Sequence, residues 1–135
     1  MRQFAYIDDG ASVHSVSLPK AAAEAGRAKL VWIHLDQREG ATRGFMIDEL
    51  RLNDVAANAM TALETRPRCE PMGSGALINL RGLSLHEEPE ADELVSIRVW
   101  IERGLIVTTA RYAIGALPAL VEAFKGGTVK DPGDF

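Results

Sequence analysis

The sequence predicts an α/β (α+β) domain, in which helices pack on the faces of a mixed β-sheet. Residues 30–35 form a nearly continuous apolar run, rich in branched and aromatic residues, as in a strand covered on both faces. Residues 54–63 carry apolar side chains at helical spacing. Residues 95–101 and 105–109 alternate around Arg103-Gly104, which predicts a β-hairpin.

The chain opens with a second predicted hairpin. Residues 4–7 and 13–16 read as its strands, and Asp9-Gly10 between them readily takes the positive φ angles of a tight turn. A helix of about two turns is expected at residues 19–26. Its ends are marked by Ser17 or Leu18 at the cap, Pro19 in the first turn and Gly26 at the stop.

Two further helices are expected after the apolar strand, over residues 42–50 and 54–63. Thr42 is a plausible cap for the first. Asn53 can cap the second, and Asp54 favours the positive end of its dipole. The predicted apolar face of the second helix consists of Leu52, Val55, Ala56, Ala59 and Leu63.

The second half of the chain is predicted to be rich in strands. A turn at residues 73–75 leads into an alternating segment at 76–81, and the hairpin follows. The hairpin's first strand has Val95, Ile97, Val99 and Ile101 on one face and Ser96, Arg98 and Trp100 on the other. A last helix carries the stripe Leu117, Leu120, Val121 and Phe124, and Gly126-Gly127 end it.

Length and composition narrow the classes of protein. The 135 residues suit one domain, which we place at residues 1–126, followed by a linker at 127–135 that is rich in Gly, Pro and Asp. A net charge of −4 argues against a general nucleic-acid binder. The single cysteine, Cys69, excludes an internal disulfide. No apolar run approaches the ~20 residues that cross a bilayer, so we expect a soluble polypeptide.

Residues 86–93 are the strongest candidate for a metal site, with five carboxylates and one imidazole among eight residues. Oxygen and imidazole ligands at close spacing suit a divalent cation such as zinc or magnesium. The candidate ligands are His86, Glu87, Glu88 and Asp92. The alternative is a solvated loop between two strands, because charge runs are usually exposed surface.

A small arginine cluster is the second candidate site. Arg66 and Arg68 flank a proline, and Arg81 lies in the next predicted strand. Arginines together can hold a phosphate, a chloride or a carboxylate. The alternative is ion pairing within the domain, which would orient the junction between helix and strand.

Other titratable residues favour structural roles. His34 lies inside the apolar strand and is predicted to be a hydrogen-bonded core residue. Asp8 and Asp9 could contribute to a cation site, but turn chemistry is the simpler role. The sequence has no nucleophile elbow, no phosphate-binding glycine loop and no paired-histidine spacing, so we expect neither an enzyme nor a required cofactor.

Several segments together resemble a known family. Trp32 precedes a short apolar stretch and Asp36, residues 52–68 form a helix ending in Arg-Pro-Arg, and residues 75–82 form the strand after it. With the hairpin at 94–111, this order resembles the CorA-like divalent metal ion transporter family. Residues 6–10 also suit its ZntB (zinc transporter) subgroup.

The resemblance implies a place in a larger assembly. Family members form homopentamers with a cytoplasmic N-terminal funnel, a long stalk helix and two transmembrane helices that carry a Gly-x-Asn motif. This chain would then be the funnel domain alone, truncated before the stalk, at the cytoplasmic face of the bacterial inner membrane. Its expected partners are copies of itself, divalent metal ions and, through absent C-terminal helices, the membrane, but no nucleic acid.

The resemblance also implies a function. The domain would contribute to cation attraction, gating and subunit assembly in a divalent cation transporter, with zinc as the ion of the subgroup. The alternative is a self-contained ligand-binding or regulatory α/β module, which would bind a small anion at Arg66, Arg68 and Arg81.

Overall fold

The computed structural model describes residues 3–37, 39–61, 68–72, 75–83, 94–110 and 117–126, with the backbone alone at 68–70, 72, 79–83, 94–96 and 117–120. In chain order the elements are β1 (Phe4–Asp8), β2 (Val13–Val16), α1 (Leu18–Glu24), β3 (Leu30–Asp36), α2 (Thr42–Asp48), α3 (Asp54–Thr61), β4 (Arg68–Met72), β5 (Gly75–Leu83), β6 (Leu94–Glu102), β7 (Leu105–Ala110) and α4 (Leu117–Lys125).

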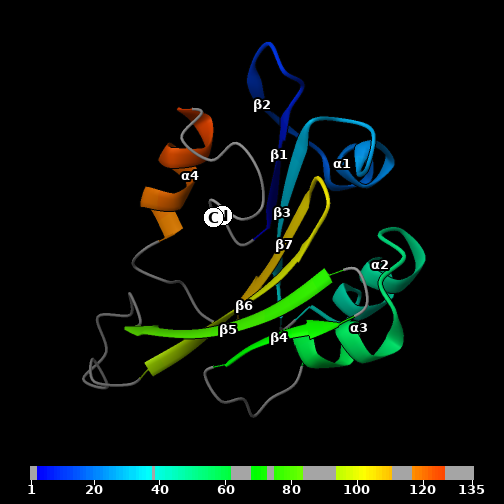
Figure 1. Ribbon diagram of the computed structural model, residues 1–135, viewed down its shortest axis with the longest axis vertical. Coiled ribbons are helices and arrows are strands. Elements are labelled where there is room, and N and C mark those ends of the chain that lie inside the picture. Colours follow the sequence, from blue (N-terminus) through cyan, green and yellow to red (C-terminus); the bar gives the residue numbers. More distant parts are fainter. Residues whose placement is uncertain are drawn as a thin grey trace.

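The described strands form one seven-stranded sheet with the order β2-β1-β3-β7-β6-β5-β4 (Figure 1). Neighbouring strands are antiparallel except β3 and β7, which are parallel and pair Trp32 with Ile106. This arrangement confirms the predicted mixed sheet. It also joins an N-terminal half, β1 to β3, to a C-terminal half, β4 to β7, through one central pairing.

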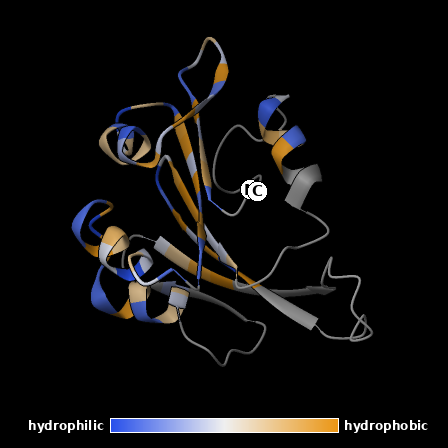
Figure 2. Ribbon diagram, turned by 180° about the vertical axis from the view of Figure 1, so that it is seen from behind, coloured by the Kyte–Doolittle hydropathy of each residue, from blue (hydrophilic) through white to orange (hydrophobic). Residues whose placement is uncertain are grey.

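Helices cover both faces of the sheet. In Figure 1, α1, α2 and α3 lie on one side of the strands and α4 lies on the other. Alternate residues of β3 serve the two faces, because successive side chains of a strand point in opposite directions. Val31, Ile33 and Leu35 belong to the core under α1 to α3, whereas Leu30 and Trp32 belong to the core under α4. Figure 2 shows the matching pattern, with hydrophobic residues along the central strands and both hydrophobic and hydrophilic residues on the helices.

Aromatic rings hold α4 against the sheet. Phe124 is 1% exposed, and its ring lies 5.6 Å from Trp32 and 6.2 Å from Tyr6, measured between centroids. Phe4 extends this cluster with an edge-on contact to Trp32 at 5.1 Å. Tilted and edge-on pairs at such distances are favourable beyond the area that they bury.

Two of the predicted helix caps are confirmed. The Ser17 hydroxyl accepts a hydrogen bond from the Lys20 amide at 3.3 Å, at the start of α1. The Asn53 side chain accepts one from the Ala56 amide at 2.7 Å, at the start of α3. Gly26 adopts a φ of +84° just beyond α1, as expected for a helix stop.

The prediction that Thr42 caps α2 is wrong. Thr42 is the first helical residue, and Ala41 occupies the cap position without a side-chain hydrogen bond. The Thr42 hydroxyl instead donates to the carbonyl oxygen of Asp36 at 2.6 Å. The Thr42 hydroxyl therefore pairs with the carbonyl at the end of β3 and does not cap the helix. An unpaired buried carbonyl would be costly, which explains this choice of partner.

The predicted apolar face of α3 is partly wrong. Val55 is 63% exposed, whereas Ala57 and Met60 are fully buried beside Ala56. The face of α3 that contacts β6 and β7 is thus rotated relative to the predicted stripe, since the sheet sets which residues pack. Leu52 is buried but precedes the helix, and Leu63 lies outside the described residues.

Strand β4 was not predicted, and it contains Pro71, which is paired in register with Ala76. The strand lies at the edge of the sheet, where a missing backbone N–H leaves no ladder bond unmade. The hairpin of β6 and β7 is confirmed, with Glu102 opposite Leu105 and Gly104 at a φ of +74° in the turn.

Candidate functional site

The four candidate metal ligands, His86, Glu87, Glu88 and Asp92, lie outside the described residues. They belong to the connection between β5, which ends at Leu83, and β6, which begins at Leu94. Within the part of the chain that the structure describes, no three His, Cys, Asp or Glu residues lie close enough to hold a metal ion. The metal site at residues 86–93, which we call the acidic loop, therefore stays a prediction from the sequence.

The register of the sheet brings together two of the three candidate arginines. Arg68 of β4 is opposite Asn79 of β5, and Asn79 is opposite Arg98 of β6. Arg81 is opposite Ser96, two residues before Arg98. Arg68, Arg81 and Arg98 therefore occupy three neighbouring strands. Arg68 and Arg98 lie at the same level of the sheet, and Arg81 is displaced from that level by two residues. Arg66 lies outside the described residues.

Arg98 is the member of this group that sequence reasoning missed. Its side chain is 2% exposed, and its Nη1 donates to the carbonyl oxygen of Met60 at 3.4 Å. Its Nε is buried and has no hydrogen-bond partner. Burial lowers the pKa of Arg98 to about 10, so the guanidinium is still charged at neutral pH. The alternating pattern of the strand gave no sign that this charge would be buried.

The carbonyl that receives Arg98 is shared. The Thr109 hydroxyl donates to the same Met60 oxygen at 2.6 Å, a much shorter contact than that of Arg98. Met60 lies in the last turn of α3, where helix carbonyls carry partial negative charge. The end of α3 thus compensates the buried cation only in part.

A second buried polar group lies on the opposite face of the sheet. Trp32 Nε1 donates to the Thr108 hydroxyl at 3.0 Å, and that hydroxyl lies 2.6 Å from Nδ1 of His34. The Phe4 ring stacks on the imidazole at 5.0 Å. Burial lowers the pKa of His34 to about 4, although Asp36 acts in the opposite direction. His34 is therefore a neutral, hydrogen-bonded core residue, as predicted.

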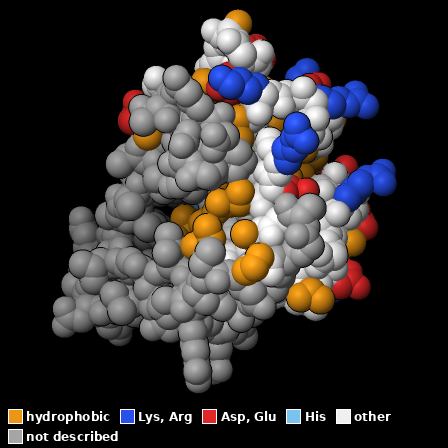
Figure 3. Space-filling view, viewed as in Figure 1, with side chains coloured by type: hydrophobic (Ala, Val, Ile, Leu, Met, Phe, Trp, Pro, Cys, Tyr) orange, Lys and Arg blue, Asp and Glu red, His pale blue; other side chains and the backbone are white. Residues whose placement is uncertain are grey.

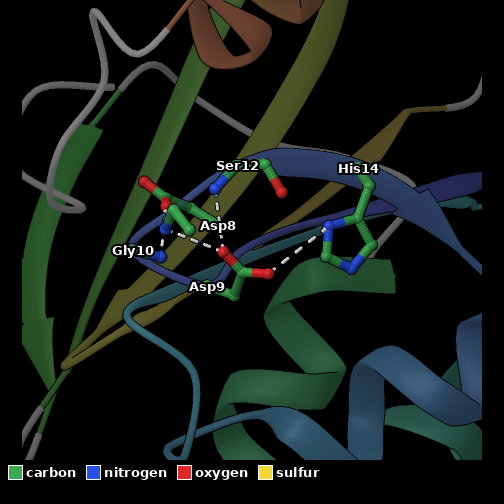
Figure 4. Close-up of polar contacts among 6 residues, drawn as sticks. Asp8, Asp9, Gly10, Ser12 and His14 are labelled. Carbon is green, nitrogen blue, oxygen red and sulfur yellow. Dashed lines mark hydrogen bonds and ion pairs between the residues drawn. The ribbon is translucent and has the colours of Figure 1, made fainter.

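The two N-terminal aspartates shape the first hairpin (Figure 4). Asp9 Oδ1 accepts from the amides of Ser12 and Ala11, both at 2.8 Å, and these bonds hold the pKa of Asp9 below its usual value. Asp8 Oδ1 accepts from the Gly10 amide at 2.9 Å. Asp9 also contacts His14, whose Nδ1 lies 3.9 Å from Oδ2. These bonds confirm the turn role of both aspartates.

The surface in Figure 3 carries Lys and Arg side chains mainly on the side of α1 and α2, with acidic side chains between them. Asp8 and Lys29 form one such mixed contact, with 3.9 Å between Oδ2 and Nζ. Hydrophobic side chains gather near the middle of this face. None of the described helices is both long enough and apolar enough to span a bilayer.

The same fold recurs in solved structures, at identities that show a shared fold alone. The full-length CmaX protein matches with a TM-score of 0.83 and 20% identity, over 99% of this chain and 42% of that protein. The ZntB cytoplasmic domain from Vibrio parahaemolyticus matches with a TM-score of 0.73 and 18% identity, over 96% of this chain and 50% of that domain. The CorA magnesium transporter from Methanocaldococcus jannaschii matches with a TM-score of 0.68 and 13% identity, over 96% of this chain and 38% of that protein.

Sequence comparison shows the family. The model of the family described as "CorA-like Mg2+ transporter protein" matches residues 27–135, and the chain belongs to that family. The Zinc transport protein ZntB of Pectobacterium atrosepticum is 33% identical over 99 residues, which are 73% of this chain and 30% of that protein. Its counterpart in Yersinia enterocolitica is 28% identical over 122 residues, 90% of this chain and 36% of that protein. The chain thus spans about a third of the length of these curated relatives.

Proposed function

We propose that this chain is the funnel domain of a divalent cation transporter of the ZntB type, and that the ion is zinc. The observation that carries the proposal is the family match over residues 27–135. The 33% identity to a zinc transport protein favours zinc over magnesium. The role is one of binding and assembly and not of catalysis, and it requires no cofactor.

The proposed mechanism is electrostatic and conformational. An acidic surface lowers the potential of cations near a pore entrance and so raises their local concentration. Residues 86–93 would supply that surface, with His86, Glu87, Glu88 and Asp92 as ligands. A cation held between neighbouring subunits of a pentamer would favour one arrangement of the ring. It does so only if it binds that arrangement more tightly than the other.

The acidic loop is tested by calorimetry with zinc and with magnesium. The variant Glu87→Gln/Glu88→Gln/Asp92→Asn should bind zinc at least roughly tenfold more weakly than the unaltered chain, because it loses three charged oxygen ligands. The matched control is Glu39→Gln/Glu49→Gln/Glu122→Gln, which removes three exposed carboxylates elsewhere. Equal zinc binding by all three proteins would remove the loop from the mechanism.

The transport role is tested with a chimera. This chain replaces the aligned N-terminal part of the Pectobacterium atrosepticum zinc transport protein, and zinc entry into proteoliposomes is followed with an internal fluorescent indicator. We expect zinc entry within about tenfold of the parent protein, and slower entry when the chimera carries the acidic-loop variant. A chimera that forms the parent's oligomer on size-exclusion chromatography but moves no zinc would contradict the proposal.

A further inference from the structure

We propose that Arg98 anchors a binding site for a small oxyanion, a phosphate or a carboxylate group, between the end of α3 and strands β4 to β6. The site takes an anion and not the transported cation, so it is independent of the acidic loop. It also gives a physical basis to the anion module that the sequence offered as an alternative.

The guanidinium of Arg98 has an unused binding edge. In arginine, Nε and Nη2 point their N–H bonds in the same direction, and this edge matches two oxygens of a carboxylate or phosphate. Nη1 makes the hydrogen bond of this side chain that the structure records, to Met60. Nε is buried without a partner. The edge that recognises oxyanions is therefore the unpartnered one.

The existing contact satisfies this buried charge poorly. The bond from Nη1 to the Met60 oxygen is 3.4 Å long, and Thr109 approaches the same oxygen at 2.6 Å. No ion pair joins Arg98 to a carboxylate among the described residues. A buried cation without a counter-charge is strongly unfavourable, so a bound anion would remove the largest electrostatic defect in the described core.

The register places two further arginine positions on the strands beside Arg98. Arg68 is two strands from Arg98 on one line of register, which puts their Cα atoms roughly 10 Å apart. Arg81 is opposite Ser96, so it is one strand away and shifted by two residues. Arginine positions on three adjacent strands suit an anion better than a divalent metal ion. A small oxyanion is the ligand that fits both the charge and the free edge.

Anion-dependent stability tests the proposal in this chain. Thermal unfolding is measured in sodium phosphate, sodium acetate and sodium chloride at equal ionic strength. Phosphate, acetate or both should raise the Tm above its value in chloride, and Arg98→Met should lose that rise. The control Arg103→Met removes an exposed arginine from the turn after the same strand and should keep it. An equal response in chloride, or an unchanged response in Arg98→Met, would overturn the site.

A second measurement needs no destabilised variant. The Arg98 Nε–H signal is followed by ¹H–¹⁵N NMR of the unaltered chain during phosphate and acetate titrations. It should shift and saturate with one of the two anions, which identifies the preferred group. Arg98→Lys keeps the charge but lacks the fork, so its affinity for that anion, measured by calorimetry, should fall roughly tenfold or more. A signal that shifts only linearly with both salts would mean that no site exists.

Discussion

His34 shows how a single buried side chain sets a response to acid. Its imidazole is 4% exposed, lies 2.6 Å from the Thr108 hydroxyl and stacks on Phe4. Burial lowers its pKa from 6.5 to about 4, so the folded protein resists protonation of a group that the unfolded chain protonates readily. Because the unfolded state binds the proton more tightly, the stabilisation is present above pH 6.5 and is lost as the pH falls towards 4.

The corresponding prediction compares His34→Gln with the unaltered chain. The free energy of unfolding of the unaltered chain should fall by roughly 2–3 kcal/mol more than that of His34→Gln between pH 7.5 and pH 4. Urea titrations at several pH values measure this difference, and His14→Gln is the control because His14 is exposed. Parallel pH profiles for His34→Gln and the unaltered chain would show that His34 does not titrate in this way.

Gly75 shows a steric requirement at the start of β5. A Cβ added there would lie 2.4 Å from Cζ2 of Trp100 and 2.9 Å from the carbonyl oxygen of Ile101. Trp100 is 3% exposed, and its Nε1 donates to Glu102 at 2.9 Å, so the ring cannot move without losing packing or a hydrogen bond. Position 75 therefore requires glycine, because the Trp100 ring on the neighbouring strand β6 occupies the space that a Cβ would need.

We predict that Gly75→Ala destabilises the chain by about 1–3 kcal/mol, the usual cost of overpacking. Gly44→Ala is the matched control. Gly44 lies in α2 and has no atom within 4 Å of an added Cβ, so alanine there should stabilise the fold by about 0.5–1 kcal/mol. Urea unfolding followed by tryptophan fluorescence measures both, and effects of the same sign would contradict the steric argument.

At the scale of elements, Phe124 anchors the described part of α4. Phe124 is the fully buried residue of its described part, and it contacts Trp32 and Tyr6 from the opposite side of the sheet to the other helices. Phe124→Ala should destabilise the fold by about 3–5 kcal/mol and raise the hydrogen exchange of the α4 amides. Val121→Ala, at a partly buried position, should cost clearly less. Equal effects of the two substitutions would mean that α4 has no single anchor.

Local chemistry explains which elements could be predicted from the sequence. The caps at Ser17 and Asn53 and the turn at Gly104 depend on neighbours within three residues, and all three predictions are confirmed. The errors at Thr42 and Val55 have tertiary causes. The hydroxyl of Thr42 is taken by the end of β3, and α3 turns the neighbours of Val55 towards the sheet.

The same distinction applies to the candidate sites. Arg68 and Arg81 could be proposed from sequence because they cluster near a proline and a following strand. Arg98 could not, because its burial depends on the register of β5 and β6 and on the end of α3, which contacts it through Met60. The acidic loop was proposed from its composition, and its ligands His86, Glu87, Glu88 and Asp92 remain predictions.

At the scale of the whole molecule, the two halves of the sheet depend on each other. The parallel pairing of β3 with β7 gives β3 its second neighbour, and every residue of both strands is buried. A chain that ends at Glu102 should therefore lack a cooperative unfolding transition and should aggregate, since β3 would present an unpaired apolar edge. Circular dichroism and light scattering measure these properties, and a cooperative, monomeric fragment would contradict this view.

The central pairing also bears on how the chain is made. His34 and Thr108, which touch across it, are 74 positions apart. During synthesis at about 5–20 residues per second, β3 leaves the ribosome several seconds before its partner exists. For that interval the most apolar strand of the N-terminal half has a neighbour on one side only. Fast growth at high temperature shortens this delay, but it also promotes the association of exposed strand edges. Under these conditions, the yield of folded domain should depend on chaperones that hold unfolded chains.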